Sequence, residues 1–582
     1  MINNRNSVNV RSAKNRDNSF DLSRDVLYTS NFYQFMPILV QATVPGDKFD
    51  VDVKQFLRLQ PLMVPTYGRF YNKFAAFWVP NHLVGEDLNA WFQNLDIYQG
   101  IASHPRIFEM EALKTAFLNG PFCQQEVPSA TTYDFMTIVE GETRKYSLLR
   151  TGKIVLQIFR SLGYPNPWDY QKKDPGETFL LNAIPLLAFV RVMADWFTPS
   201  QIYPTTAVCE FMTCVRQNKD FYFSGQVIYD SNTGYLSASV LELLFSNWLK
   251  QWYCVTLDND VVTSPWRYPD HPYSQTSNII EPNVYPNDNF DDAVNIQNNV
   301  DYMTTTSSIN ARAINLLKKA HDYVIRNGLA GARYVQRMFA HFGVQSNDAK
   351  THYAHLLERW QSEVLVGDVT SQSDTLNGSV GRVLGDYAGK ALGNGDGHVS
   401  ATFDDFGTFI VLQWLEPKII NGSTTDRECL KYSPTDFYTP EYDSEGVTEQ
   451  HRCESYTFDK TSALPNKDSN YPVGYMPRYY EYKRGRDLIT GDFVRYDGMD
   501  SWHLMREFKP NESFVAQSIQ LVTQNYQTGD TYLRIFQNPD PSADHVYYTT
   551  LVRFNAQRPM LSIDESTGLP SGNTRLTPNM KI

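Results

Sequence analysis

The segment Arg69–Val79 reads RFYNKFAAFWV, and it decides how the chain folds. In an extended backbone alternate residues share a face, so one side of this segment is formed by Phe70, Phe74, Ala76 and Trp78. The opposite side is formed by Tyr71, Lys73, Phe77 and Val79. This period-2 alternation predicts a β-strand with two unlike faces.

Further strands are predicted outward from this segment, toward both ends of the chain. Phe32–Val44 is rich in strand formers and ends at Pro45-Gly46, with Pro37 at an edge or a break. The C-terminal third contributes predicted strands at Phe409–Leu415, Phe514–Val522, Tyr532–Phe536 and His545–Phe554. In the last of these, one face is lined by Val546, Tyr548, Thr550, Val552 and Phe554.

The middle of the chain has helical spacing instead. Apolar residues three and four apart predict helices at Ile309–Val324, Tyr334–Phe342, Val240–Trp248 and Leu187–Arg191. Strands near both ends can pair if this middle region is an insertion into one β unit, as in a jelly roll. The expected fold class is therefore mainly β, with long helix-and-loop insertions.

Composition limits the function. The 582 residues are 42% hydrophobic and 14% aromatic, which is enough for a large core and for Tyr-rich interfaces. The net charge of −12 argues against binding nucleic acid through the whole surface. The six cysteines include no C-x-x-C pair, which favours a reduced compartment. The most apolar stretch, Phe179–Val190, is too short to span a bilayer, and the N-terminal residues do not resemble a secretory signal.

Patterns for catalysis or metal binding are weak. His352, His355 and Glu358 could share one helical face as metal ligands, but a solvated helix explains them equally well. Asn394 and Asp396 lie among glycines and faintly resemble a calcium loop, for which a flexible loop is the simpler interpretation. The sequence therefore assigns no catalytic, cofactor-binding or metal residue.

Two basic segments are candidates for nucleic-acid contact. The N-terminal 24 residues have a net charge of +3, and their cations are Arg5, Arg11, Lys14, Arg16 and Arg24. The cluster at 479–486 combines tyrosines, on which bases stack, with cations that meet phosphates: Tyr482, Lys483, Arg484 and Arg486. The alternatives are a solubilising tail for the first segment and a surface strand with interface tyrosines for the second.

Several motifs, in order, resemble the major capsid protein of gokushovirus-like microviruses, which are small single-stranded DNA phages. They run from about residue 25 to 560 and comprise Val44–Phe49, Arg58–Leu62, Gly331–Tyr334, His341–Val344 with Ser346 and Asp348, Phe437–Pro440, Glu449-Gln450, Gly474-Tyr475, Tyr482, Thr490-Gly491, Trp502-His503 and Arg558–Met560. Residues Thr351–Trp360 depart from the family pattern.

The resemblance implies a single eight-stranded antiparallel jelly roll of the viral capsid type. Its expected parts are a basic N-terminal arm (1–25), first strands (26–80), insertions (81–400, with a candidate surface loop at 265–306), remaining strands (401–560) and a C-terminal tail (561–582). The family implies sixty copies in a T=1 icosahedral shell, with pentameric and trimeric contacts, around circular single-stranded DNA.

The resemblance also implies partners and a location. The partners are an internal scaffold protein, a pilot protein, a small basic DNA-binding protein and a host surface receptor, without a membrane. The location is the virion, assembled in the host cytoplasm, and the role is structural and not enzymatic. A carbohydrate-active or glycan-binding β protein is the alternative, since exposed aromatics stack on sugars. A trimeric phage tail or receptor-binding protein is less favoured, because no repeat is present.

Overall fold

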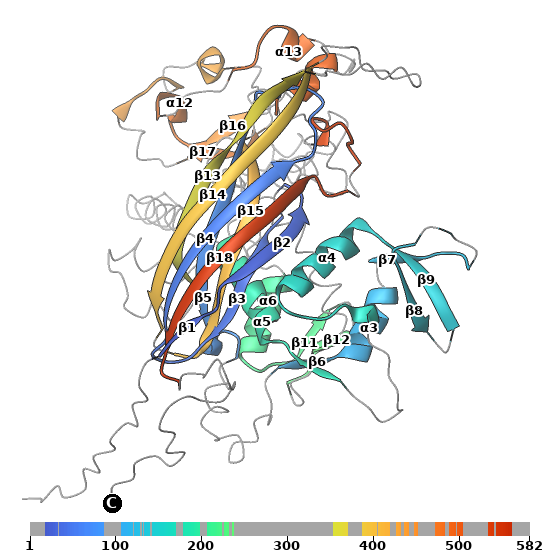
Figure 1. The fold of residues 1–582 in the computed structure, drawn as a ribbon. Coiled ribbons are helices and arrows are strands. Elements are labelled where there is room, and N and C mark those ends of the chain that lie inside the picture. Colours follow the sequence, from blue (N-terminus) through green and yellow to red (C-terminus); the bar gives the residue numbers. More distant parts are fainter. Residues whose placement is uncertain are drawn as a thin grey trace, which may run out of the picture.

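A computed structural model gives the fold of the chain (Figure 1). The residues it describes are 18–32, 34–85, 106–119, 122–128, 131, 133–139, 142–169, 179–197, 207–223, 226–231, 236–237, 353–370, 387–403, 405–418, 426–431, 436–440, 447–451, 472–483, 488–495, 497–504, 533–540 and 543–560.

The body of the protein is a curled, nine-stranded antiparallel sheet with the order β1-β18-β4-β14-β13-β5-β15-β3, in which β2 also pairs with β18. Its strands are β1 (Asn18–Asp21), β2 (Arg24–Ser30), β3 (Met36–Thr43), β4 (Lys48–Leu59), β5 (Arg69–Pro80), β13 (His355–Thr370), β14 (Tyr387–Thr402), β15 (Gly407–Lys418) and β18 (Val546–Arg558). In this sheet the C-terminal strand β18 pairs with the N-terminal strands β1, β2 and β4, which confirms the prediction that strands near both ends of the chain pair.

The sheet curls so that its two halves enclose an apolar interior. One half holds β1, β2, β18, β4 and β14, and the other holds β13, β5, β15 and β3. One buried cluster draws Val51 from β4 and Val552 from β18, and packs them with Val411 from β15. Along β18 buried and exposed residues alternate from Val546 to Ala556, which confirms the face predicted for this strand.

A closed set of polar side chains crosses this interior between the halves. Asn72 donates to Gln55, and Gln413 donates to Asn72, each over 2.7 Å. The Tyr28 hydroxyl donates to Gln413 and accepts from Gln55, which also donates to Thr550. Because each partner is satisfied, the network links strands of both halves without leaving a buried polar group unpaired.

Strands β5 and β15 are buried on both faces. The predicted strand at Arg69–Val79 is confirmed as β5, and its outward residues Ala75, Phe77 and Val79 pack in a second core with the helical insertion. This explains why both predicted faces of the segment are rich in apolar residues. Helix α5 (Ile184–Val192) confirms the helix predicted after Pro185 and lies against this face.

The insertion between β5 and β13 is a compact unit beside the sheet (Figure 1). Besides α5, its described elements are η1 (Asn81–Leu83), β6 (Ile107–Glu109), α3 (Met110–Asn119), β7 (Cys123–Gln125), β8 (Phe135–Val139), β9 (Glu142–Leu148), α4 (Arg150–Ser161), η2 (Pro167–Asp169), β10 (Leu180–Asn182), η3 (Met193–Phe197), α6 (Ala207–Arg216), β11 (Phe221–Phe223) and β12 (Gln226–Tyr229). A second set, between β15 and β18, comprises η7 (Arg427–Leu430), β16 (Val447–His451), β17 (Pro472–Pro477), α12 (Tyr480–Lys483), α13 (Asp492–Arg495) and η10 (Asp497–Trp502).

Of three other strand predictions, two are confirmed and one is wrong. Phe32–Val44 contains β3, which ends before the Pro45-Gly46 turn and has an irregular register at Pro37, as expected of a proline in a strand. Phe409–Leu415 is confirmed within β15. Tyr532–Phe536 is wrong as a strand over its described residues: Leu533 is helical, Arg534 and Ile535 form a turn, and Phe536 makes an isolated bridge to Leu62. Its apolar residues are buried under the end of the sheet, which periodicity does not distinguish from a strand.

Strand β13 and all but the last two residues of β14 lie within the 81–400 range expected to hold helices and loops, so that range also contributes to the sheet. The glycines of β14 hid this strand in the sequence. A Cβ on Gly397 would lie 1.9 Å from the Trp360 indole, which is itself stacked on Phe74. Glycine is therefore required there for close packing, and its presence does not mark a loop.

Four element predictions lie outside the described residues. They are the helices at Ile309–Val324, Tyr334–Phe342 and Val240–Trp248 and the strand at Phe514–Val522.

Candidate nucleic-acid contacts and assembly surfaces

Of the five cations of the basic arm, only Arg24 lies among the described residues. It is the first residue of β2, its side chain is exposed, and its Nη2 donates to the Val40 carbonyl over 3.5 Å. Partial burial lowers the pKa of its guanidinium, which nevertheless stays charged at neutral pH. Arg5, Arg11, Lys14 and Arg16 lie outside the described residues, as do Arg484 and Arg486.

The cluster at 479–486 is described from Tyr479 to Lys483, and it is helical from Tyr480 onward. Tyr482 and Lys483 end the short helix α12, so the alternative of a surface strand is wrong. The positive φ of 60° at Tyr479 turns the chain from β17 into this helix. Tyr482 is about half exposed, and its ring lies 6.2 Å from Tyr438 and 6.3 Å from Tyr479.

Lys431 ties this aromatic group together. Its Nζ donates to the Tyr482 hydroxyl over 2.8 Å and lies 4.2 Å from the centre of that ring. It also contacts Glu428 at 2.7 Å and Glu481 at 3.1 Å. Burial alone would lower the pKa of Lys431, but these contacts outweigh it and raise the pKa. Tyr482 thus has a local partner and half of its surface available for another molecule.

The two metal-site hypotheses fail on secondary structure. His355 and Glu358 lie in strand β13, and His352 lies outside the described residues, so the supposed helical face does not exist. Asn394 and Asp396 lie in strand β14, so both the calcium-loop and the flexible-loop interpretations are wrong. Within the described part of the chain, no three His, Cys, Asp or Glu side chains are grouped to hold a metal ion.

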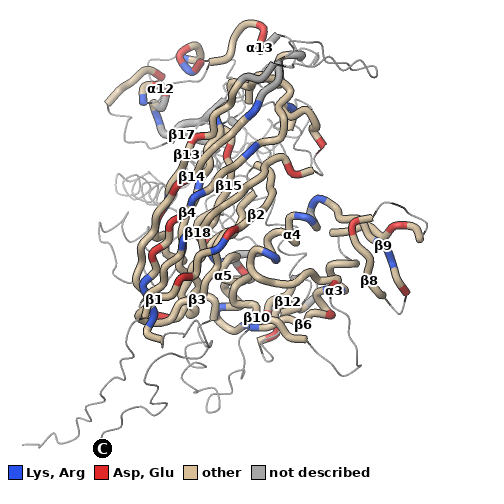
Figure 2. Tube along the Cα trace, in the orientation of Figure 1, with Lys and Arg blue, Asp and Glu red and all other residues tan. Residues whose placement is uncertain are grey.

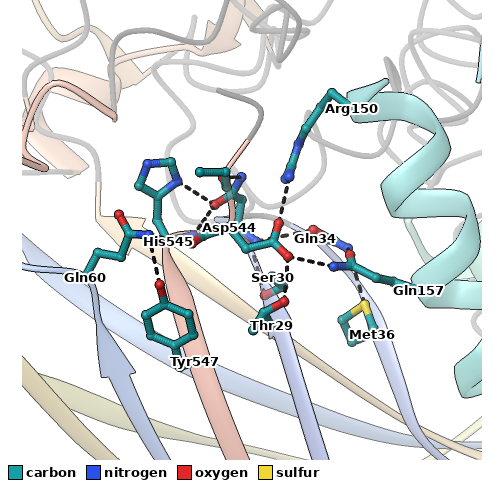
Figure 3. A network of polar contacts seen from close by, with 12 residues as sticks. Thr29, Ser30, Gln34, Met36, Gln60, Arg150, Gln157, Asp544, His545 and Tyr547 are labelled. Carbon is teal, nitrogen blue, oxygen red and sulfur yellow. Dashed lines mark hydrogen bonds and ion pairs between the residues drawn. The ribbon is translucent and has the colours of Figure 1, made fainter. Parts of the chain in front are cut away.

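A buried polar network joins the helical insertion to the sheet (Figure 3). At its centre is Asp544, just before β18. Arg150 Nη1 contacts Asp544 Oδ1 over 2.7 Å, and Gln157 Nε2 donates to Oδ2 over 2.7 Å. Both residues are on α4, so one carboxylate holds two turns of that helix. The Thr29 hydroxyl of β2 also donates to Oδ2.

The network extends on both sides of Asp544. Gln34 Nε2 donates to Gln157, and the amide of His545 donates to the Asn31 side chain over 2.8 Å. Burial alone would raise the pKa of Asp544, but the Arg150 charge and the hydrogen bonds lower it, so the carboxylate is ionised at neutral pH. Burial lowers the pKa of the neighbouring His545.

A second buried ion pair lies on the outward face of the β5–β15 pair. Lys73 Nζ contacts Glu416 over 2.7 Å, and the two side chains are only 2% and 10% exposed. Burial raises the pKa of Glu416, although the Lys73 charge opposes this shift. Neither this pair nor Asp544 was singled out by sequence analysis, because isolated charged residues give no signal of their burial.

Charge in the described residues is mixed. Lys and Arg alternate with Asp and Glu along the strands of the body, and in this view neither sign gathers over one region (Figure 2). None of the described helices combines the length and apolar character needed to cross a membrane.

Comparisons with known proteins identify the family. The sequence profile of the family described as "Capsid protein (F protein)" matches residues 8–99 and 261–566, which is more than half of the chain. The Capsid protein VP1 of Bdellovibrio phage phiMH2K is 21% identical over 560 residues, which cover 90% of this chain and 91% of that protein. The Capsid protein VP1 of Chlamydia phage 1 is 24% identical over 260 residues, 43% of this chain and 42% of that protein, so this alignment spans less than half of the relative. The chain therefore belongs to the Capsid protein (F protein) family of the microviruses, as its ordered motifs had predicted.

Proposed function

We propose that the chain assembles with copies of itself into a closed T=1 icosahedral shell that encloses a circular single-stranded DNA genome. Membership of a capsid protein family supports self-assembly and a structural role. The sheet that forms the subunit body is proposed to be a single eight-stranded jelly roll. The domain divisions are proposed as expected from the sequence, except that β13 and β14, which begin before residue 401, belong to the jelly roll and not to the insertions.

The observation that carries the proposal is the strand order. Without the short β1, the first half of the sheet is β2-β18-β4-β14 and the second half is β3-β15-β5-β13. Numbered along the chain, these strands are the first, eighth, third and sixth, and then the second, seventh, fourth and fifth. Nearly every connection therefore crosses from one half to the other, which is what a double-sheet jelly roll of two Greek keys requires. Such bodies are typical of viral capsids.

Assembly then depends on geometry and not on catalysis. A subunit that presents several different surfaces to its neighbours forms a closed shell when the rotations between copies close on themselves. Each contact can be weak, because every subunit makes many of them. The rigid sheet fixes the angles between these surfaces, while the loops and insertions supply them.

The nucleic-acid contacts are proposed to come from the arm and from the 479–486 cluster. Cations on the arm would neutralise DNA phosphates, and the half-exposed Tyr482 ring could stack on a base beside Lys483. A scaffold protein, a pilot protein, a small basic DNA-binding protein and a host receptor are the further proposed partners. Assembly is proposed to take place in the host cytoplasm.

Expression of the full chain with its virion partners tests the proposal. Sedimentation and negative-stain imaging should show uniform shells that protect circular single-stranded DNA from nuclease. A chain that stays monomeric under these conditions, or that cleaves or binds glycans, would overturn the capsid function.

The DNA contacts of the arm have a separate test. Replacing Arg5, Arg11, Lys14 and Arg16 with Gln should lower the DNA content of the particles while shells still form. Replacing the three arginines with Lys is the matched control, because it keeps the charge, and it should package normally. Unchanged DNA content in the Gln variant would refute the role of the arm.

A further inference from the structure

A small sheet in the helical insertion has one buried and one exposed face. It is three-stranded, with the order β7-β9-β8, and it lies at the far end of the insertion, away from the main sheet (Figure 1). Residues 100–260, which contain this sheet, fall between the two ranges that match the family profile.

The inner face of this sheet is firmly packed. Phe135 of β8 stacks on Tyr146 of β9, with ring centres 5.4 Å apart, and on Trp168, with ring centres 4.0 Å apart. Trp168 in turn contacts Phe117 of α3. These four packed rings therefore hold the sheet at a fixed position on the insertion, and it can present its other face as a rigid surface.

The outer face is apolar along β8, where water would favour polar residues, and the residues of β9 opposite this strand are Thr143 and Lys145. Met136 and Ile138 are 50% and 43% exposed, and they point away from the buried Phe135 and Thr137. Antiparallel sheets with one solvated face usually carry polar side chains there, and clustered exposed apolar residues indicate an interaction site.

Neighbouring residues enlarge this surface. Lys145 lies opposite Met136 in the register of β8 and β9, and its Nζ lies 5.0 Å from the Tyr133 ring centre and donates to the Pro128 carbonyl. The exposed Tyr133 and the loop that contains the exposed Val127 are thereby held at the same face. We name Val127, Tyr133, Met136, Ile138 and Lys145 the β8 face.

We propose that the β8 face docks on a second copy of this chain within the shell. This inference rests on the proposed function, because a capsid subunit must contact other copies of itself. The position of the face, at the end of a rigid unit that projects from the body, suits a contact between subunits.

The chemistry of the β8 face favours a protein partner over nucleic acid. Lys145 is its one cation, and Glu126, whose backbone amide donates to the Lys145 carbonyl, supplies a carboxylate beside it. Phosphates need several cations together, whereas an apolar centre with charges of both signs at its rim matches a typical protein interface.

The test is a double substitution, Met136→Lys with Ile138→Lys, in the full chain expressed with its virion partners. Both side chains point to solvent, so the variant should fold with an unchanged circular dichroism spectrum and urea midpoint. The yield of shells should fall by about tenfold or more, since charge would replace the apolar centre of a contact. Yield equal to that of the wild type overturns the inference, whereas failure of the wild-type chain to assemble overturns the proposed function instead.

The insertion offers a matched control. Tyr222 and Val227 are an exposed cross-strand pair on the neighbouring β11-β12 sheet, and the same two Lys substitutions there should leave the yield of shells unchanged. An equal loss in this control would show that added positive charge blocks assembly by itself, and it would refute a specific role for the β8 face.

A photo-crosslinking residue at position 138 identifies the partner directly. In assembled particles, mass spectrometry should find adducts that join position 138 to a peptide of another copy of this chain. Adducts only with DNA, with another virion protein or within the same copy would overturn the inference, and so would the absence of any adduct.

Discussion

Asp544 should stabilise the contact between the helical insertion and the sheet. Replacing it with Ala removes the acceptor of Arg150 on α4 and of the hydroxyl of Thr29 on β2. The Arg150 and Asp544 side chains are each 14% exposed, so the remaining guanidinium recovers little water. Losing one partner of a buried pair costs about 3–5 kcal/mol, and the partial exposure places Asp544→Ala near the lower limit, at about 3 kcal/mol.

A double-mutant cycle separates the pair from its surroundings. Arg150→Ala should cost about 2 kcal/mol, because Asp544 keeps its bonds from Thr29 and Gln157. The double variant should be less destabilised than the sum of the two, with a coupling of about 1–2 kcal/mol. Urea unfolding of the unassembled chain, followed by tryptophan fluorescence, measures all three. A coupling below about 0.5 kcal/mol, the range of an exposed pair, would refute the argument.

Three further predictions follow from the buried contacts. Gly397→Ala should lower the free energy of unfolding by about 1–3 kcal/mol, since its Cβ would overlap an indole, whereas Gly367→Ala, whose Cβ meets only one atom at 3.8 Å, should be nearly neutral in the same urea assay. Lys73→Met should cost about 3 kcal/mol by leaving Glu416 buried without its lysine partner, and adding Glu416→Leu should recover most of this loss, as a thermal-shift comparison would show. Folding lowers the pKa of Asp544, so the ionised carboxylate adds fully to the free energy of unfolding above the unfolded-state pKa of about 3.9, and this stabilisation is lost as the pH falls through the folded-state pKa. The urea midpoints of the wild type and of Asp544→Asn should therefore converge only below about pH 4.

The strands that could be predicted are those with one clear physical signal. β18 alternates because one side faces the interior and the other faces water, and its predicted inner face matches the buried residues from Val546 to Phe554. β5 was predicted from the alternation of its residues between two faces, and the structure shows that both of these faces are largely buried.

The strands that were missed obey a different constraint. In β13 an irregular register between Leu356 and Glu358 interrupts the alternation that sequence analysis relies on. In β14 glycines lie where side chains of other strands fill the interior, such as Trp360 over Gly397, so few large apolar residues mark this strand. Such packing depends on residues far away in the sequence, so it cannot be predicted from a short stretch of sequence around the strand.

The candidate sites divide in the same way. Arg24 and Tyr482 could be selected as candidates because charge and aromatic content are local properties, and both are exposed; their contact with nucleic acid stays a prediction. Asp544 was missed, since its partner Arg150 is 394 residues away. The β8 face was missed because its exposed apolar residues look like ordinary core residues until the sheet shows which face is covered.

Asp544 and the β8 face are connected through α4, and this makes a last prediction. Helix α4 begins directly after β9, and the Leu149 amide between them donates to the Phe122 carbonyl over 2.9 Å. A Cβ on Gly152 would lie 2.0 Å from the same carbonyl oxygen, so the start of the helix is pressed against the chain that enters β7. The carboxylate that anchors α4 to the sheet therefore also sets the position of the β8 face relative to the body.

The two kinds of variant should consequently fail differently. Asp544→Asn should lower both the urea midpoint of the isolated chain and the yield of shells, because the β8 face would be presented at a less defined angle. The Met136→Lys, Ile138→Lys variant should lower the yield alone. A less stable Asp544→Asn chain that still assembles as well as the wild type would show that the shell does not depend on this anchor. The position of the β8 face would then have to be set by the packed rings beneath it.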